Sequence, residues 1–149
     1  MPTIGPATAG DAPSLALTER VRAFLAEPHF ASLATVSESG APSQAVIWYR
    51  LEADGRVMVN SREGRRWPAN LRRDARANLA VFWGHDPNRW VGLTCLVDEI
   101  DDDRERGRND IMALARRYGD LGSEAAFRQQ QRVTFRLRIV RVHDHLEDD

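Results

Sequence analysis

Three short runs of strand-forming residues follow one another between residues 30 and 61, with only tight turns between them. The runs read FASLATVS, PSQAVIWYRL and RVMVNS, and they are rich in the branched and aromatic side chains that favour β-structure. The stretch Glu38–Gly40 and the tetrapeptide EADG contain residues typical of turns. Parallel strands need a crossover of about a dozen residues or more, so these short connections predict an antiparallel meander.

Three further strands and three short helices are expected along the rest of the chain. The strands are predicted at residues 77–84, 89–100 and 133–140, and the helices at residues 17–27, 68–75 and 108–119. In the last strand, apolar side chains alternate with mostly polar ones, which predicts one buried face and one largely solvent-exposed face. Six strands with few, short helices predict a mainly β protein, built as a small six-stranded antiparallel barrel.

With 149 residues, 42% of them hydrophobic, the chain is long enough for one domain with a single core. We expect a mobile N-terminal arm over residues 1–16, which are rich in Pro, Gly and Ala, and one folded domain over residues 17–149. The arm lacks the pattern of a secretion signal, and no run of 18 apolar residues occurs. Because Cys95 is the only cysteine, no disulfide framework is possible, and we expect a cytoplasmic protein without membrane insertion.

Several kinds of chemistry are excluded by the residues that the chain lacks. All 21 basic residues are Arg, so chemistry that needs a lysine, such as Schiff-base formation, is ruled out. There is no G-x-G turn of a Rossmann domain and no G-x-S-x-G elbow of a hydrolase. His143 and His145 are expected to be solvated, and the acidic segment 98–110 lacks the spacing of a calcium loop, so no metal site is predicted. No side chain is singled out as catalytic.

Residues 63–76, EGRRWPANLRRDAR, place Arg65 and Arg66 directly before an expected helix. A helix N-terminus attracts negative charge, so arginines at this end are unfavourable unless an anion lies among them. We therefore predict that Arg62, Arg65 and Arg66 bind a phosphate or carboxylate group.

An alternative assigns no ligand to this cluster, because Glu63 and Asp74 are close enough in the sequence to neutralise the arginines. The arginines further along, Arg72, Arg73 and Arg76, are expected only to face solvent. Nucleic acid is not the predicted anion. The net charge of −1 gives no overall attraction to it, and no exposed aromatic ladder accompanies the arginines.

Alternation along the second strand separates its side chains onto two faces. Gln44, Val46 and Trp48 share one face, while Ala45 and Tyr49 point to the other. The first face can lie along a planar heteroaromatic ring, with Gln44 hydrogen-bonding to the edge of the ring. Equally, Val46 and Trp48 can be ordinary core residues, so the strand by itself leaves both possibilities open.

The order of these segments resembles a known family. The pattern LATV, G-x-P, W, DG and G-R-R-x-x-x-N-L-R-R-D-x-R, followed by DEIDDD, RRYG and RVTFRLRIVRVH, is similar to the pyridoxamine-phosphate-oxidase-like split β-barrel superfamily. It looks most like the actinobacterial branch that uses the deazaflavin coenzyme F(420). The resemblance extends from about His29 to His143. It implies a split-barrel domain that binds a cofactor, and a homodimer with two cofactor sites at the interface.

The resemblance also implies which residues bind the cofactor. In flavin-binding relatives, the contacts lie on the second strand, at the end of the third strand and on a basic pair after the next turn. Carried over by position, the implied residues are Gln44, Ala45, Val46, Trp48, Asn60, Ser61, Arg65, Arg66 and Trp67. Trp90, at the start of the fifth strand, is implied near the cofactor of the partner subunit.

Two positions depart from the family pattern. Trp67 stands where classical flavin oxidases have a lysine, so one cation for the phosphate of FMN is missing. The tail of F(420) carries several negative charges, which Arg62, Arg65 and Arg66 can engage along an open groove. Thr94–Leu96 replaces a run similar to Arg-Gly-Arg, which alters the contacts implied for the partner subunit and the substrate pocket.

The resemblance implies an F(420)-dependent oxidoreductase. It would transfer a hydride from reduced F(420) to an unsaturated small-molecule acceptor of the quinone, enone or tetrapyrrole class. Such a site mainly positions donor and acceptor and excludes water, so no residue is required as a base. Two alternatives stay open: an FMN-binding enzyme of the same fold, and a non-enzymatic carrier of a cofactor or tetrapyrrole.

Overall fold

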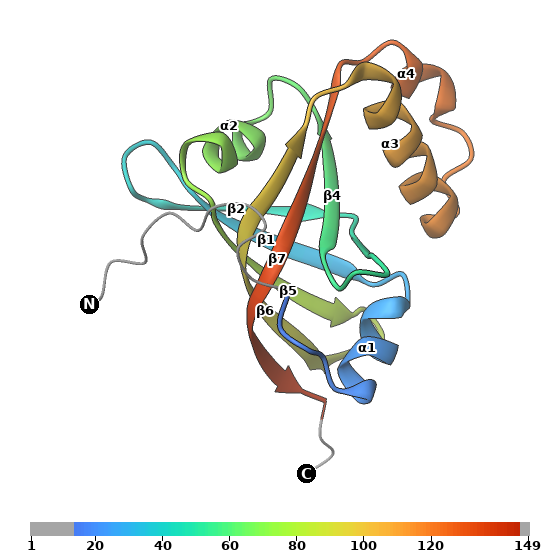
Figure 1. Ribbon diagram of the computed structural model, residues 1–149. Helices are drawn as coiled ribbons and strands as arrows, with labels where there is room; N and C mark the ends of the chain where they lie inside the picture. Colours follow the sequence, from blue (N-terminus) through green and yellow to red (C-terminus); the bar gives the residue numbers. More distant parts are fainter. Residues whose placement is uncertain (1–13, 147–149) are drawn as a thin grey trace.

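The computed structural model describes residues 14–146, which form one β-sheet and a few helices (Figure 1). The strands are β1 (Phe30–Val36), β2 (Pro42–Ile47), β3 (Arg50–Leu51), β4 (Val57–Arg62), β5 (Arg76–Trp83), β6 (Asp86–Asp101) and β7 (Arg132–His145). The helices are α1 (Glu19–Ala26), α2 (Arg66–Arg73), α3 (Arg104–Tyr118) and α4 (Glu124–Arg128). The mainly β fold with short helices that the sequence predicts is therefore confirmed.

The strands pair antiparallel in the order β2-β1-β5-β6-β7-β4-β3. β2 and β3 lie at opposite ends of this order, yet only Trp48 and Tyr49 separate them along the chain. The two edges of the sheet are thus joined directly, and the sheet closes into a barrel. Its interior holds the hydrophobic core, in which Leu33, Leu79 and Phe135 are fully buried.

The second expected strand is interrupted, so the sheet has seven strands where six were predicted. Tyr49 lies in the interruption, and its backbone takes side-chain partners in place of a neighbouring strand. Its N–H donates to the Tyr118 hydroxyl (3.3 Å), and its carbonyl accepts from Nε of Arg117 (3.0 Å). The Tyr49 hydroxyl donates to the carbonyl oxygens of Leu25 (2.9 Å) and Glu27 (3.0 Å). These contacts satisfy the backbone without a ladder and let the chain turn from one edge to the other.

The last strand corrects a second expectation, because the predicted solvent-exposed face of β7 is largely covered. Thr134 is fully buried and Arg138 is 6% exposed. α3 packs against β7 and β4 and covers this face (Figure 1). The Thr134 hydroxyl donates to Asp110 of α3 at 2.7 Å. Apolar and mostly polar side chains do alternate along β7, but α3 covers much of the face that was expected to meet solvent.

Local signals at the helix ends explain where the helices begin and stop. Thr18 caps α1 by accepting from the Val21 N–H, and Asp103 caps α3 by accepting from the Arg106 N–H. α3 ends at Gly119, whose φ of 73° is a conformation that glycine adopts without strain. α3 begins four residues earlier than expected, and α4 was not expected at all.

The expected arm at residues 1–16 falls mostly outside the described residues, which begin at Ser14. Within the described part, the Leu15 N–H donates to the Ile139 carbonyl of β7 at 2.9 Å. Among residues 14–146, no helix has the length and apolar character needed to cross a membrane.

Candidate functional site

A cavity of about 350 Å³ lies where the β2–β3 break, β4, the start of α2 and the α3–α4 pair meet. Aliphatic and aromatic side chains form most of its wall: Phe30, Val46, Ile47, Trp48, Trp67, Ile111, Leu114 and Phe127. Polar and charged side chains complete it: Asn60, Arg65, Asp120, Ser123 and Arg132. The cavity therefore combines flat apolar surface with two cations and one carboxylate.

Trp48 provides a flat wall, and its position is fixed from α3. Its indole stacks on the ring of Tyr118, with centroids 5.1 Å apart and planes 7° apart. The Tyr118 hydroxyl donates to the carbonyl oxygen of His29, which holds the phenol ring in place. Burial raises the pKa of Tyr118 above its ordinary value, so this hydroxyl keeps its proton. Tyr118 thus supports Trp48 without lining the cavity itself.

Arg132 is a buried cation in the wall of the cavity, with 6% of its surface exposed. Nε donates to Oδ1 of Asn60 (2.9 Å), and Nη1 donates to Oε1 of Gln130 (2.6 Å). The guanidinium also lies over the ring of Phe127, 5.3 Å from its centroid. Among residues 14–146 it has no carboxylate partner, so its charge is held by neutral groups alone.

Burial, together with the charges of Arg65 and Arg62, lowers the pKa of Arg132 from 12.5 to about 10. The lowered pKa means that this environment disfavours the charged form. A negatively charged ligand would instead favour the charged form of Arg132, because it supplies the missing counter-charge. The three arginines are thus arranged so that an anion stabilises them together. Arg62 is placed beside Arg132 by the pairing of β4 with β7.

The carboxylates that were considered as neutralising partners for Arg65 and Arg66 are taken by other arginines. Glu63 accepts two hydrogen bonds from Arg72, at 2.6 and 2.8 Å, and Asp74 pairs with Arg76 at 2.7 Å. The ion pairs lower the pKa of both carboxyl groups. The alternative in which Glu63 and Asp74 neutralise the cluster is therefore contradicted.

The start of α2 lies next to these unpaired arginines. The helix begins at Arg66, two residues earlier than expected, so Pro68 is its third residue. Arg65 occupies the N-cap position, but its side chain makes no capping hydrogen bond, and the first turn contains no acidic residue. The first N–H groups of a helix have no partner within the helix, so this end adds donors and positive potential for an anion.

The structure brings only part of the sequence-predicted site together around the cavity. Five of those residues line it, namely Val46, Trp48, Asn60, Arg65 and Trp67. Val46 is 69% exposed and Trp48 partly exposed, so neither is an ordinary core residue. Trp67 is 5% exposed, because it also packs on Phe135 in the core.

The remaining predicted residues lie elsewhere. Gln44 is exposed on β2, Ala45 packs against the core, and the Ser61 hydroxyl donates to its neighbour's carbonyl oxygen. Arg66 lines a separate groove with Arg73, beside the β1–β2 turn. Arg62, as described, lies beside Arg132 without lining the cavity.

Trp90 also lies outside the cavity, on the surface formed by β6 and β7. Its indole stacks on the imidazole rings of His143 and His145, at centroid distances of 4.9 and 5.4 Å. Both histidines are exposed, as expected. Within residues 14–146, no group of three or more His, Cys, Asp or Glu side chains is placed to hold a metal ion. Burial raises the pKa of the Cys95 thiol to about 12, so that residue stays protonated in the core.

Sequence reasoning missed the residues that later segments bring to the cavity. Arg132 was not selected because it stands in an arginine-rich strand, and strand pairing alone brings it beside the third expected strand. Asp120, Ser123 and Phe127 belong to the connection around α4, for which the sequence carries no strong periodicity. One signal was available. Arg132 and Thr134 are two residues apart and therefore lie on the same face of β7, and both are buried.

The family model for pyridoxamine 5'-phosphate oxidase matches residues 17–146, nearly the whole described part of the chain. The chain belongs to this family. The resemblance to the pyridoxamine-phosphate-oxidase-like superfamily is therefore confirmed, and the closed seven-stranded sheet is the split β-barrel of that family. A comparison with curated proteins finds no match.

Several solved structures are similar to this chain in fold. An F(420) reductase superposes with a TM-score of 0.72 at 20% identity, covering 85% of this chain and 98% of the reductase. A conserved hypothetical protein of Mycobacterium tuberculosis gives a TM-score of 0.69 at 21% identity, covering 90% and 88% of the two chains. A haem-storage protein of Vibrio cholerae gives 0.65 at 17% identity, covering 87% and 95%. At these identities the likeness supports the fold alone.

Proposed function

We propose that this protein is an oxidoreductase that uses reduced F(420) to reduce an unsaturated organic molecule. The proposal rests above all on one observation: Arg132 and Arg65, neither with a carboxylate partner among the described residues, line a cavity whose wall is otherwise mostly apolar and aromatic. A cofactor with an anionic tail and a flat ring system is complementary to this combination of charge and apolar surface. The similarity in fold to an F(420) reductase agrees with this choice.

Each part of the site has a role in the proposed reaction. Arg65, Arg132 and the open N-terminus of α2 bind the charged part of the cofactor, and Trp48 lies along its ring. When bound, the reduced deazaflavin supplies a hydride from carbon. The protein then needs to orient donor and acceptor and to exclude water, which the apolar wall does.

We further propose that the protein is a homodimer with the site beside the interface. The outer face of β2, β1 and β5 carries small side chains at Ser32 and Ala80, with Val46 paired across from Ser32. Val46 and Phe30 are large apolar side chains that are 69% and 46% exposed. Both also line the cavity, so a second subunit packed on this face would close the open side of the site.

A second candidate is an FMN enzyme of the same family, and Arg132 is the observation that favours it. Trp67 cannot supply the charge of the missing lysine, because its indole is neutral, and the ring is buried against Phe135. Arg132, however, provides a second cation next to Arg65, which offers the phosphate of FMN an alternative partner.

Binding titrations distinguish the two cofactors. The purified chain is titrated with F(420) and with FMN, followed by fluorescence, and the loaded protein is then offered quinone, enone and tetrapyrrole acceptors. The proposal expects tighter binding of F(420) and reduction of at least one acceptor class. Preference for FMN would replace it with the second candidate. Binding of F(420) without turnover of any acceptor would instead favour a carrier.

A further inference from the structure

Asp120 and Ser123 form a carboxylate–hydroxyl pair in the wall of the cavity, at the connection between α3 and α4. The Ser123 hydroxyl donates to both carboxylate oxygens of Asp120, at 2.9 and 3.1 Å. Both side chains are half-buried. Arginines and aromatic rings account for the binding of the cofactor in the proposed function, so this pair has no role there.

The ends of two helices hold the pair in position. Gly119 ends α3, and the next N–H, that of Asp120, donates to the Ala115 carbonyl oxygen at 2.9 Å. Ser123 occupies the N-cap of α4, where a serine side chain ordinarily accepts from a helix N–H. Its hydroxyl makes no such capping bond and is bonded to Asp120 instead.

The Asp120 carboxylate has no cationic partner among residues 14–146, although two arginines line the same cavity. No nitrogen of Arg65 or Arg132 lies within 4.0 Å of its oxygens. A carboxylate and two guanidinium groups are thus kept apart in one cavity, and a ligand can engage both kinds of group.

Toward a ligand, the pair acts as a hydrogen-bond acceptor. The one proton of the Ser123 hydroxyl is donated to Asp120, and a carboxylate has none to donate, whereas both side chains keep free lone pairs. Asn60, the neutral amide in the same wall, already donates both its hydrogens within the protein. A ligand that reaches Asp120 and Ser123 is therefore recognised by its N–H or O–H groups.

The volume of the cavity indicates the size of that ligand. At about 350 Å³, the cavity is near the lower end of the range for ligand pockets, which is about 300 to 1,000 Å³. In the proposed reaction the cavity receives the reacting ring of the cofactor as well as the acceptor. A small cyclic acceptor fits the remaining space better than a tetrapyrrole does.

We propose that Asp120 and Ser123 bind the acceptor and select small unsaturated carbonyl compounds that carry an N–H or O–H donor. This inference rests on the proposed function and deepens it, because it narrows the acceptor to one chemical class. In the reaction, a hydride from reduced F(420) and a proton from water add across the C=C bond, so the acceptor is reduced and the cofactor oxidised. Asp120 and Ser123 take part in neither transfer and determine specificity alone.

Maleimide and N-methylmaleimide are a matched pair of acceptors for the test. They share the same conjugated C=C bond and differ only in whether the ring nitrogen carries a hydrogen or a methyl group. Reaction of maleimide with thiols does not interfere, because Cys95 is the only cysteine, is buried in the core and has a pKa raised by burial to about 12.

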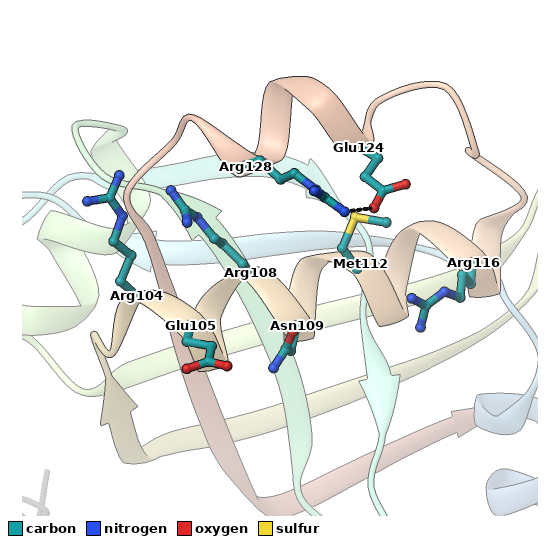
Figure 2. Close-up of a pocket in the computed structure, with 8 residues that line it drawn as sticks. All are labelled: Arg104, Glu105, Arg108, Asn109, Met112, Arg116, Glu124 and Arg128. Atoms are coloured by element: carbon teal, nitrogen blue, oxygen red, sulfur yellow. Dashed lines mark hydrogen bonds and ion pairs between the residues drawn. The ribbon is translucent and has the colours of Figure 1, made fainter.

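The value of kcat/KM for each acceptor is measured with the wild type, Asp120→Ala, Asp120→Asn and the control Glu124→Ala, all saturated with reduced F(420). Glu124 is a matched control, because its carboxylate pairs with Arg128 at 2.6 Å and lines a separate surface hollow beside α3 (Figure 2). Fluorescence titration with F(420) should give the same affinity for all four proteins, which shows that the variants fold and bind the cofactor.

We expect the wild type and Glu124→Ala to favour maleimide by about tenfold, the effect of one hydrogen bond to a charged group. Asp120→Ala should abolish the preference. Asp120→Asn should keep about a threefold preference, because its amide oxygen still accepts a hydrogen bond but carries no charge.

Equal kcat/KM for the two acceptors in the wild type would overturn the proposal, and so would a preference for maleimide that survives in Asp120→Ala. If Asp120→Ala does not fold, Asp120→Asn decides the question, since it preserves the shape of the side chain. A preference as large as that of the wild type in this variant would also contradict the proposal.

Failure of the proposed function gives a different result, in which F(420) does not bind or neither acceptor is reduced. Succinimide and N-methylsuccinimide then probe the cavity without turnover, in NMR titrations of the wild type and Asp120→Ala. Tighter binding of succinimide that depends on Asp120 would support the pair as a donor-specific site. Equal binding of the two imides would overturn it.

Discussion

At the scale of single residues, the decisive feature is Arg132, a buried cation that has no carboxylate partner among residues 14–146. Several arginines, among them Arg56, Arg72 and Arg76, form ion pairs at the surface, where such pairs contribute little to stability. Arg132 is different, because it is buried and held only by amide oxygens and an aromatic ring. A fold retains a desolvated cation of this kind at a cost, and binding an anion offsets that cost.

We expect the substitutions Arg132→Gln and Arg65→Ala to weaken binding of F(420) by about 1.5 to 3 kcal/mol each, because each removes a charge-assisted hydrogen bond. Arg66→Ala should have a smaller effect, since Arg66 faces another groove. Fluorescence titration measures the affinities, with Arg76→Ala, which is paired to Asp74 at the surface, as the control. If Arg66→Ala weakens binding more than Arg65→Ala, the cavity is not where the anion binds.

The pH dependence follows from the lowered pKa of Arg132. The side chain carries its charge below about pH 10 and loses it above, so anion binding should decline as the pH rises through 10 in the unliganded protein. The variant Arg132→Gln should lack this decline. Binding titrations in matched buffers from pH 8 to 10.5 would show whether the affinities of the two proteins for F(420) depend on pH differently.

At the scale of elements, Arg117 ties α3 to α1 and to the β2–β3 break. Its guanidinium donates to the carbonyl oxygens of Leu25, Ala26 and Glu27 at the C-terminus of α1, at 3.2, 2.9 and 2.7 Å. It also donates to the Tyr49 carbonyl. A cation at a helix C-terminus complements the helix dipole and satisfies carbonyls that have no partner inside the helix. Because Tyr118 follows directly and supports Trp48, the same contact fixes one wall of the cavity.

Replacing Arg117 by Ala should lower the free energy of unfolding by about 2 kcal/mol, because several carbonyls lose a charged donor. Arg116→Ala, one residue earlier, removes an exposed side chain that has no hydrogen-bond or ion-pair partner among residues 14–146, and it should change stability by less than about 0.5 kcal/mol. Urea denaturation of both variants tests the difference. Equal stabilities would mean that water replaces Arg117 at no cost.

The sequence predicts elements well where periodicity is local and less well where distant segments decide. All six expected strands and the three expected helices are present with shifted ends, and the second strand is split into β2 and β3. The interruption at Tyr49 was not visible, because residues 42–51 carry an unbroken β pattern and the partners that replace the ladder come from α1 and α3. Arg132 could not be assigned to the site for the same reason, since only the pairing of β7 with β4 brings it there.

At the scale of the whole molecule, the proposed dimer gives the cavity its missing wall. The outer face of β2, β1 and β5 lacks a covering helix, whereas α3 covers β4 and β7. A second copy of the chain on the uncovered face would bury Val46 and Phe30 and would isolate the cavity from water.

We expect the substitution Ala80→Arg to convert the dimer into a monomer, because a long charged side chain on this flat face prevents close approach of two sheets. Val140→Arg introduces the same side chain at an exposed position of β7 and should leave the dimer intact. Sedimentation velocity gives the mass of each variant. A wild-type chain that sediments as a monomer would remove the basis for the shared site.

The pairing of β4 with β7 also has a consequence for how the chain is made. β7 leaves the ribosome after the other six strands of the sheet, yet Val57 of β4 pairs with Leu137 of β7. Apart from the two residues of β3, β4 therefore has no neighbouring strand while residues 63–131 are synthesised. Unpaired strand edges invite pairing with other chains, and contacts between distant segments form slowly. The cavity and its anion site thus form together, only after β7 has been made.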